Sequence, residues 1–252
     1  MKQHYSQFVA ACAAALLASC GTQIQMTEAI PAKVNIGRGT TLVVNAPYRD
    51  YGLKSAFQEK IMADGYYKLP GYSADGPVAM LNIEDVETGR VNGLPYLSAD
   101  ARVATQHQTL YKKGYMSAPY QDSQGVLRYD RASRNIAHNV MNDLTPHEKN
   151  IYVRVNGSKE NPDVEKGALA CRAGNWELGE THAKQALKVN PQDPEALFLM
   201  GIIERNKMHY ARSTQYFKQA DALKPSAKYK SAISKNAVME RNDKYVQQQL
   251  AS

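Results

Sequence analysis

A 34-residue offset between matching residues near the C-terminus most constrains how this chain can fold. Small, aromatic and proline residues recur at this offset, in the pairs Gly167 and Gly201, Trp176 and Tyr210, Ala186 and Ala220, and Pro191 and Pro225. A period of this length is typical of repeats in which each unit is a helical hairpin that buries its apolar face only against a neighbouring unit. The sequence therefore predicts two consecutive helical hairpins over residues 163–225.

Each predicted hairpin has its own helices and turn. The expected helices cover residues 163–172 and 176–189 in the first hairpin and begin at residues 194 and 210 in the second. Gly174 and Asn175 suit the first turn because both tolerate positive φ. In the second hairpin, Gly201 is small where two helices must approach closely, and Phe217 is large where a gap must be filled. These residues resemble the pattern of the tetratricopeptide repeat, with the stronger match in the second hairpin.

The residues after the second hairpin predict a capping helix. Two hairpins bury too little apolar surface, because about three stacked units are needed for stability and the ends of an array need a polar face. Residues 226–252 place Tyr229, Ile233, Val238 and Met239 near one helical face, with basic side chains around the rest. Lys235 stands where a third repeat would carry Gly, so we interpret this segment as a capping helix and tail.

The first 20 residues predict an export signal and a lipid anchor. Residues 1–19 contain Lys2 and an apolar run that is too short to span a bilayer, as in a signal peptide. The end of this run, Leu17-Ala18-Ser19-Cys20, resembles the lipobox of bacterial lipoproteins. The resemblance implies cleavage before Cys20, a diacylglycerol on its thiol and an acyl chain such as palmitate on its amino group, which together anchor the protein stably. The alternative is an ordinary secretory signal that contains a cysteine.

The residue after the lipobox bears on the location of the protein. In bacterial lipoproteins, Asp directly after the lipidated cysteine is a signal for retention in the inner membrane. This chain has Gly21 at that position and so does not resemble the retained lipoproteins. The resemblance therefore implies attachment to the outer membrane, facing the periplasm, with the inner membrane as the alternative. Because Cys12 is removed with the signal peptide and Cys20 is lipidated, Cys171 has no disulfide partner in the mature chain. We expect Cys171 to be a small, semi-buried residue.

The net charge of +7 does not indicate a nucleic-acid partner. The excess of Lys and Arg over Asp and Glu is small in each part of the chain and is only slightly larger after residue 225. For an exported protein this distribution predicts a solvated surface, and weak attraction to anionic lipid or to a cell-wall polymer stays open.

Residues 39–150 predict an α/β domain between a lipidated tether at 20–38 and a linker at 151–162. Strands are expected at residues 40–45, 77–86 and 101–112, and helices at residues 51–63 and 131–144. This order predicts the α+β class: a small α/β sandwich with a mixed sheet, followed by an all-helical domain. The residues Leu42-Val43-Val44, Asp64-Gly65-Tyr66, Ile136-Ala137 and Leu144-Thr145-Pro146 carry a further resemblance. They are similar to the periplasmic domain of curli-secretion-channel lipoproteins and of lipoprotein activators of peptidoglycan synthases.

The sequence lacks the motifs of common catalytic and metal sites. The glycines around Ser73 do not have the spacing of a nucleophile elbow, and no phosphate-binding loop is present. The histidines do not form the pair that a zinc-protease helix requires. We therefore predict no catalytic residue, no metal ligand and no cofactor, and we expect no enzymatic activity. The alternative is a hydrolase with a deep polar pocket in the α/β domain.

The resemblance to tetratricopeptide repeats implies a partner-binding groove. The matching positions of the first helix in each hairpin give the candidate residues Arg172, Phe198, Ile202, Arg205 and Asn206. Chaperone-binding members of the family clamp a terminal carboxylate with Lys and Asn at two positions held here by Val164 and Ala168, so no such clamp is expected. An apolar groove edged by polar side chains suits a helix or an extended peptide. Alternatively, these residues pack against the α/β domain or the capping helix.

Two functional hypotheses follow from these features. The first is a membrane-anchored periplasmic lipoprotein that binds or scaffolds an envelope protein or peptide through its tetratricopeptide repeats, without catalysis. The second is an accessory factor for secretion or cell-wall synthesis that acts through its α/β domain. The identity of the partner and the oligomeric state stay open at this point.

Overall fold

The computed structural model describes residues 21–71, 76–157 and 160–252, which form two compact units. The helical unit comprises residues 21–29 and 148–243, and the sheet unit comprises residues 30–147 and 244–252. Each unit has its own apolar core, and the fold class is α+β, as predicted. The predicted signal peptide and Cys20 lie outside the described residues. No described helix is long and apolar enough to cross a membrane.

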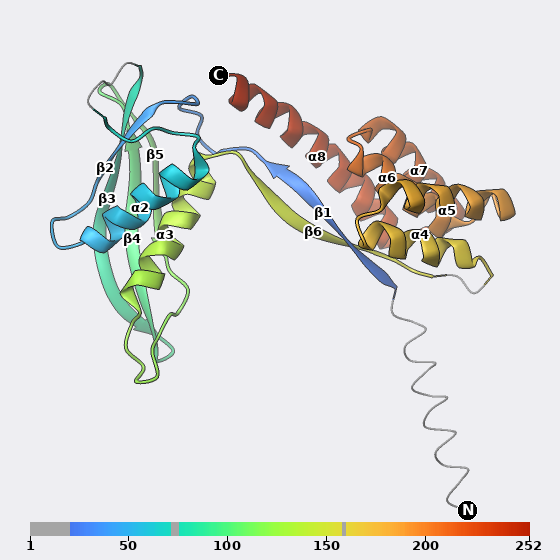
Figure 1. The fold of residues 1–252 in the computed structure, drawn as a ribbon, viewed down its shortest axis with the longest axis horizontal. Helices are drawn as coiled ribbons and strands as arrows, with labels where there is room; N and C mark the ends of the chain where they lie inside the picture. The colour runs from blue at the N-terminus through green and yellow to red at the C-terminus, as the bar shows by residue number, and fades with distance from the viewer. Residues whose placement is uncertain (1–20, 72–75, 158–159) are drawn as a thin grey trace, which may run out of the picture. The chain divides into compact units, whose positions relative to one another are not determined.

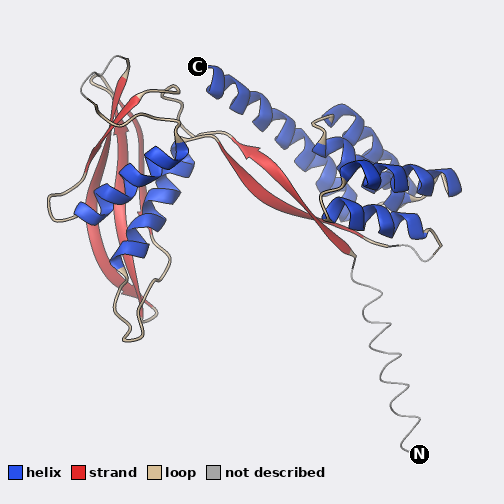
Figure 2. Cartoon of the chain, in the orientation of Figure 1, coloured by secondary structure: helices blue, strands red, loops and turns tan. Residues whose placement is uncertain are grey.

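The sheet unit is built on a four-stranded mixed sheet in the order β2-β3-β4-β5 (Figures 1 and 2). Its strands are β2 (Thr41–Asn45), β3 (Val78–Val91), β4 (Leu94–Ala104) and β5 (Thr109–Met116). β2 and β3 run parallel and are connected through α2 (Tyr51–Asp64), whereas the other neighbouring strands are antiparallel. The turn between β3 and β4 is Asn92-Gly93, with positive φ at both residues, as a two-residue type I′ hairpin requires.

Helices α2 and α3 (Tyr129–Leu144) lie together on one face of this sheet (Figure 2). Their core residues follow helical spacing and are fully buried: Leu53, Phe57 and Ile61 on α2, and Ile136, Val140 and Leu144 on α3. They share one core with alternate residues of the strands, including Leu42, Leu81 and Val103. The predicted helices at 51–63 and 131–144 and the predicted strand at 40–45 are therefore confirmed.

The predicted strand at residues 101–112 is wrong. The segment contains the end of β4, a turn and the start of β5, with Ala104 paired to Thr109 across the turn. The backbone N–H of Thr105 donates to the carbonyl of Gln108 at 2.9 Å and closes this turn. Apolar and polar residues alternate along the segment because both strands of a hairpin present alternate residues to the same core.

The helical unit contains two successive helical hairpins followed by a long helix (Figure 1). Its helices are α4 (Pro162–Arg172), α5 (Trp176–Val189), α6 (Pro194–Asn206), α7 (Tyr210–Leu223) and α8 (Ala227–Ala251), the last of which passes into the sheet unit after Asp243. The helices agree with those expected from the 34-residue offset. Gly174 has φ 83° in the first turn, and the Asn175 side chain accepts a hydrogen bond from Leu178 N at 3.1 Å, which caps α5.

The recurring glycines mark points of close helix packing. A Cβ atom at Gly167 would lie 2.8 Å from Leu199 Cδ2 and 3.1 Å from the carbonyl oxygen of Gly179. A Cβ atom at Gly201 would overlap the ring of Phe217. The sequence offset therefore reflects two equivalent positions at which a side chain larger than hydrogen has no room.

A two-stranded ribbon of β1 (Thr22–Ile30) and β6 (His147–Val155) completes the helical unit. Its inward residues Ile24, Met26 and Val155 are buried in the same core cluster as the helices. The prediction of a tether at 20–38 is wrong for residues 22–30, which form β1. The prediction of a linker at 151–162 is wrong for residues 151–155, which belong to β6. The apolar residues of β1 and β6 alternate with polar ones, which buries one face of each strand although neither segment is apolar on average.

Candidate functional site

The β1–β6 ribbon occupies the apolar surface on which the partner groove was expected. Val164, Ala168, Phe198 and Ile202, which the repeat pattern assigns to the groove, form one core cluster with the inward residues of the ribbon. In Figure 1 the ribbon runs alongside α4 and α6. The apolar residues of the predicted groove are therefore part of the core that the ribbon and the hairpins share.

The predicted groove residues separate into a buried set and an exposed set. Phe198, Ile202 and Arg205 are at most 3% exposed, whereas Arg172 and Asn206 are exposed. Phe198 and Arg205 line the same surface cavity, and Ile202 lies within the core. The structure therefore brings only two of the five predicted residues together at one site.

Arg205 is a buried cation held by neutral groups. Its Nε donates to Asn236 Oδ1 at 2.9 Å, and its Nη2 donates to the carbonyl of Ala232 at 2.6 Å. Its guanidinium also lies 4.7 Å from the centre of the Phe217 ring, a favourable cation–π distance. Among the described residues, none forms an ion pair with Arg205.

The pKa of Arg205 falls because the side chain is buried. Burial lowers this pKa to about 10, although the nearby Tyr210 and Glu28 oppose the change. Arg205 therefore keeps its positive charge at neutral pH.

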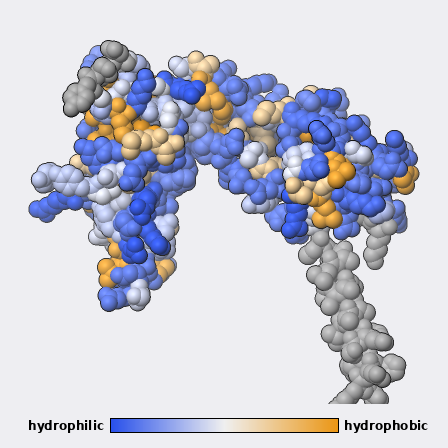
Figure 3. All heavy atoms as spheres, viewed as in Figure 1, coloured by the Kyte–Doolittle hydropathy of each residue, from blue (hydrophilic) through white to orange (hydrophobic). Residues whose placement is uncertain are grey.

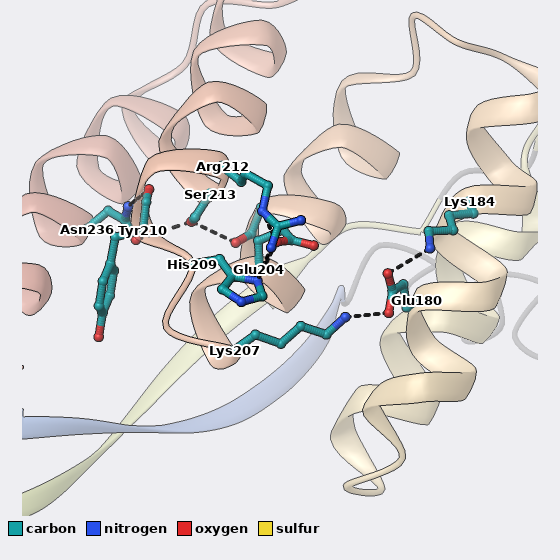
Figure 4. A network of polar contacts seen from close by, with 10 residues as sticks. Glu180, Lys184, Glu204, Lys207, His209, Tyr210, Arg212, Ser213 and Asn236 are labelled. Atoms are coloured by element: carbon teal, nitrogen blue, oxygen red, sulfur yellow. Dashed lines mark hydrogen bonds and ion pairs between the residues drawn. The ribbon is translucent and has the colours of Figure 1, made fainter.

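Asn236 on α8 holds the buried polar network together. Its Oδ1 accepts from Arg205 and from Ser213 Oγ, and its Nδ2 donates to the carbonyl of Tyr210 at 2.7 Å and to Thr214 Oγ1 at 2.8 Å. Ser213 also donates to the carbonyl of Gly201 at 2.8 Å. Figure 4 shows the Asn236 amide beside the main chain of Tyr210, with Ser213 close by. Because every polar atom of the Asn236 amide is bonded, this contact fixes α8 against the second hairpin without an unsatisfied group.

A cavity of about 170 Å³ lies beside this network on the helical unit. Its lining comes from β6, α6 and α8: Tyr152, Val153, Arg154, Phe198, Arg205, Lys228, Ser231, Ala232 and Lys235. We name it the Arg205 cavity. It is large enough for several water molecules or for a small charged group.

Lys228 forms one wall of the Arg205 cavity and is partly neutralised. Its Nζ lies 2.5 Å and 2.7 Å from the two carboxylate oxygens of Glu195, and the Tyr229 hydroxyl donates to the same carboxylate at 2.8 Å. The same Nζ lies 4.4 Å from the centre of the Phe198 ring. Burial lowers the pKa of Lys228, whereas Glu195 acts in the opposite direction.

A second depression adjoins the Arg205 cavity at the end of the ribbon. It has a volume of about 570 Å³ and is lined by Gly21, Thr22, Gln23, Gln25, Tyr152, Arg154, Glu165, Leu169 and Arg172. Tyr152 and Arg154 line both spaces. The predicted groove residue Arg172 therefore lies at this depression and not in the Arg205 cavity.

Ion pairs on the outer side of the hairpins are structural. Glu204, whose side chain is 6% exposed, lies 3.1 Å from Arg212 Nε and 3.0 Å from His209 Nδ1. Glu180 on α5 bridges Lys184 at 2.8 Å and Lys207 at 2.5 Å (Figure 4). These contacts tie α5, α6 and α7 together, and none of these residues lines the Arg205 cavity.

Sequence reasoning missed most of the cavity lining. It places Lys228 and Lys235 on a solvated helix face, and Tyr152 and Arg154 in a linker. The spacing of seven residues between the two lysines, which is two helical turns, is the signal that could have placed them on one face. The strand alternation of Ile151, Val153 and Val155 could likewise have identified β6.

The reactive side chains described next, outside the Arg205 cavity, are either hydrogen-bonded or buried. Cys171 is 2% exposed, and burial raises the pKa of its thiol to about 12. In the sheet unit, a cavity of about 240 Å³ includes Tyr66 and Thr145, whose hydroxyls donate to the carbonyls of Gln249 and Met141. Within the described ranges, no group of three or more His, Cys, Asp or Glu side chains could hold a metal ion.

Comparison with known proteins gives only partial likenesses. No model of a known protein family matches the sequence, and no curated protein matches it significantly. A minor lipoprotein from Acinetobacter baumannii is 14% identical over 43% of this chain and 96% of its own, with a TM-score of 0.33. A PelC dodecamer from Paraburkholderia phytofirmans is 13% identical over 50% of this chain and 98% of its own, with a TM-score of 0.30. Rare lipoprotein B from Shewanella oneidensis is 9% identical over 60% of this chain and 90% of its own, with a TM-score of 0.20. The solved structures that resemble part of this chain thus include bacterial lipoproteins.

Proposed function

We propose that this protein is a lipoprotein anchored to the outer membrane that faces the periplasm and binds another envelope protein through its helical unit, without catalysis. The observation that carries the proposal is the pair of stacked hairpins with equivalent close-packing points at Gly167 and Gly201. This arrangement is what tetratricopeptide repeats need, and such repeats bind other proteins.

The anchor follows from the sequence that precedes the described residues. Leu17-Ala18-Ser19-Cys20 resembles a lipobox, and β1 begins at Thr22. A lipid on Cys20 would therefore hold the helical unit at the membrane with only Gly21 in between. The inner membrane is the alternative location.

The proposal that the protein lacks catalysis draws on three nucleophilic groups of the described residues. The Tyr66 and Thr145 hydroxyls donate to main-chain carbonyls and are not paired with a base. The Cys171 thiol is buried with a raised pKa, which disfavours the reactive thiolate.

The ribbon limits the surface of the helical unit that a partner can contact. Because the ribbon covers Phe198 and Ile202, the partner would contact exposed residues at the edges of the hairpins. Asn206 is exposed at the end of α6, and Met208 in the following turn is 67% exposed. The visible face of the helical unit is mostly hydrophilic with small apolar patches (Figure 3), so a partner would meet a mixed surface.

A second candidate function rests on the sheet unit. Strands β3, β4 and β5 form a depression of about 550 Å³ that includes Asp85, Glu87 and Asp100. An acidic surface of this size could serve an accessory factor for secretion or cell-wall synthesis that acts through its α/β domain.

Photo-crosslinking from single positions separates these functions. A photoreactive residue is placed at Asn206 or Met208 in the helical unit, or at the exposed Lys112 in the sheet unit, in cells that process the lipoprotein normally. Crosslinks from Asn206 and Met208 but not from Lys112 support the proposed function. Crosslinks from Lys112 alone would favour the second candidate, and no crosslink from any position would argue against protein binding.

A further inference from the structure

The Arg205 cavity has a basic lining. Four of its lining residues are basic, and none of the described residues that line it is acidic; the basic residues are Arg154, Arg205, Lys228 and Lys235. Glu195 neutralises Lys228, as described above. Arg154, Arg205 and Lys235 make no ion pair with any described residue.

Arg205 is the residue for which this imbalance matters most. Its hydrogen bonds go to neutral groups, and Glu28 attracts it electrostatically without forming an ion pair, so its lost hydration is replaced only in part. Two of its nitrogens, Nε and Nη2, are used by Asn236 and Ala232, and Nη1 makes no hydrogen bond to the described part of the chain. Because the guanidinium is held in place by Asn236 and Phe217, Arg205 is pre-oriented for an anion that enters the cavity.

The cavity lies beside the point at which the chain continues toward Cys20. A Cβ atom at Gly21 would lie 2.5 Å from the carbonyl oxygen of Val155 and 3.0 Å from Cγ of Arg154. Arg154 lines the Arg205 cavity, so one side chain connects the residue after Cys20 with the cationic site. A lipid on Cys20 would therefore bring the cavity close to the headgroup layer of the membrane.

The side chains between the anchor and the cavity are those that favour a membrane interface. Tyr152 is 59% exposed and Leu169 is 47% exposed, and both lie with Arg172 at the depression that adjoins Gly21. Tyr combines an apolar ring with a polar hydroxyl, and Arg places its charge at the phosphate level while its stem stays in apolar surroundings.

We propose that the Arg205 cavity binds the phosphate group of an anionic glycerophospholipid in the membrane to which Cys20 is anchored. The inference rests on the lipid anchor in the proposed function. Arg154 and Lys235 attract the phosphate at the mouth of the cavity, and Arg205 donates to it from Nη1. Basic pockets next to a membrane surface are suited to lipid headgroups because each basic residue adds electrostatic attraction.

Position favours a phospholipid over a carboxylate of a partner protein. A protein carboxylate could pair with the same cations, but it would have to approach the end of the ribbon that the anchor holds at the membrane. Phosphate groups are present there at high local concentration, and they also match the donor geometry of a guanidinium.

The test uses the chain from Gly21 to Ser252, which contains both cores and no lipid. Binding to vesicles of phosphatidylcholine alone is compared with binding to vesicles that also contain phosphatidylglycerol. We expect binding only to the anionic vesicles, with a loss of about fivefold for each of Arg154→Gln and Lys235→Gln. Both residues are exposed, so these variants keep the fold. Lys230→Gln is the matched control, because Lys230 is an exposed residue of α8 that does not line the cavity.

Soluble ligands identify the source of the anion. Short-chain phosphatidylglycerol, inorganic phosphate and succinate are titrated into the same protein, and the amide signals of Ala232 and Lys235 are followed by NMR. Saturable shifts with the short-chain lipid at lower concentration than with phosphate or succinate support the proposal. Equal affinity for inorganic phosphate would assign the site to free phosphate, and stronger binding of succinate would assign it to carboxylates; either result overturns the proposal.

Two further outcomes would also overturn it. If Lys230→Gln weakens vesicle binding as much as Lys235→Gln, attraction to the membrane is a property of overall charge and not of the cavity. If the protein binds neither vesicles nor any soluble anion, the cavity is not an anion site. Neither result bears on the anchor, which is tested separately by following Cys20→Ala between the membrane and soluble fractions of cells.

Discussion

Asn236 accepts a hydrogen bond from the Nε atom of Arg205 at 2.9 Å, and both side chains are buried. The two residues are 31 positions apart and belong to α8 and α6. Through this contact the capping helix both closes the helical unit and fixes the one buried arginine among the described residues. The stability of the unit and the shape of the Arg205 cavity therefore depend on the same pair.

Asn236→Ala should destabilise the helical unit by about 3 kcal/mol, because it leaves Arg205, Ser213 and the Tyr210 carbonyl without their buried partner. Urea unfolding followed by the fluorescence of Trp176, the single tryptophan, measures this unit specifically. Asn206→Ala at an exposed position is the control, with an expected change within about 0.5 kcal/mol. Equal midpoints for the two variants would refute a supporting role for Asn236.

Gly201→Ala should cost about 1–3 kcal/mol, because the added methyl group has to displace the ring of Phe217. Shortening the opposing side chain in the double variant Gly201→Ala/Phe217→Leu should recover part of that loss relative to Phe217→Leu alone. Gly71→Ala is the matched control, since no atom lies within 4 Å of a Cβ built there. Additive effects of the two substitutions in the helical unit would contradict the proposed contact.

Ile24→Ala should lower the stability of the helical unit by about 2–5 kcal/mol, although the residue is far from the helices in sequence. The cause is a cavity in the shared core of ribbon and hairpins. The same Trp176 fluorescence reports it, and Gln25→Ala on the exposed side of β1 should leave the midpoint unchanged. If Ile24→Ala is equally neutral, the first strand does not belong to this core.

Cys171 should resist alkylation in the native protein. With a pKa of about 12, the thiolate is a very small fraction at pH 8, and the side chain is also buried. The folded thiol ionises less readily than the unfolded thiol, so its contribution to stability is present below pH 9 and is lost as the pH rises above that value. Mass spectrometry after iodoacetamide treatment should detect labelling only in denaturant, and rapid native labelling would contradict the burial of Cys171.

Asp143 should make the sheet unit sensitive to acid. Burial by itself would raise the pKa of this carboxyl, but contacts from Lys113, Lys33, Tyr111 and Tyr115 outweigh it and hold the pKa below its usual range. Because the folded pKa is the lower one, the stabilisation is present above pH 4 and is lost progressively as the pH falls below it. Asp143→Asn should therefore be less stable at neutral pH and less dependent on pH between 4 and 2.

Amide hydrogen exchange in β4 and β5, measured over this pH range, checks the prediction for Asp143. Glu87→Gln at an exposed position of β3 is the control and should keep the acid dependence of the unmodified protein. An unchanged pH dependence in Asp143→Asn would show that other carboxylates determine the acid response.

Local signals in the sequence were sufficient for the helices and for strand β2, whereas the hairpin of β4 and β5 was missed. The 34-residue offset predicted α4 to α7, and Gly174 with Asn175 predicted their first turn. The spacing of Leu53, Phe57 and Ile61 predicted α2. These predictions succeeded because helical spacing, turn residues and caps are properties of neighbouring positions.

The sequence by itself determined the α+β class and the helical hairpins, because these depend on spacing, turn residues and a repeat that can be read along the chain. Only the tertiary structure decided that residues 22–30 and 147–155 pair and cover the predicted groove, and that Arg154 from β6 meets Arg205 and Lys235. Strand pairing joins segments more than a hundred residues apart, and nothing in either segment alone specifies its partner. The free surface of the helical unit is therefore a consequence of long-range pairing, which local patterns do not encode.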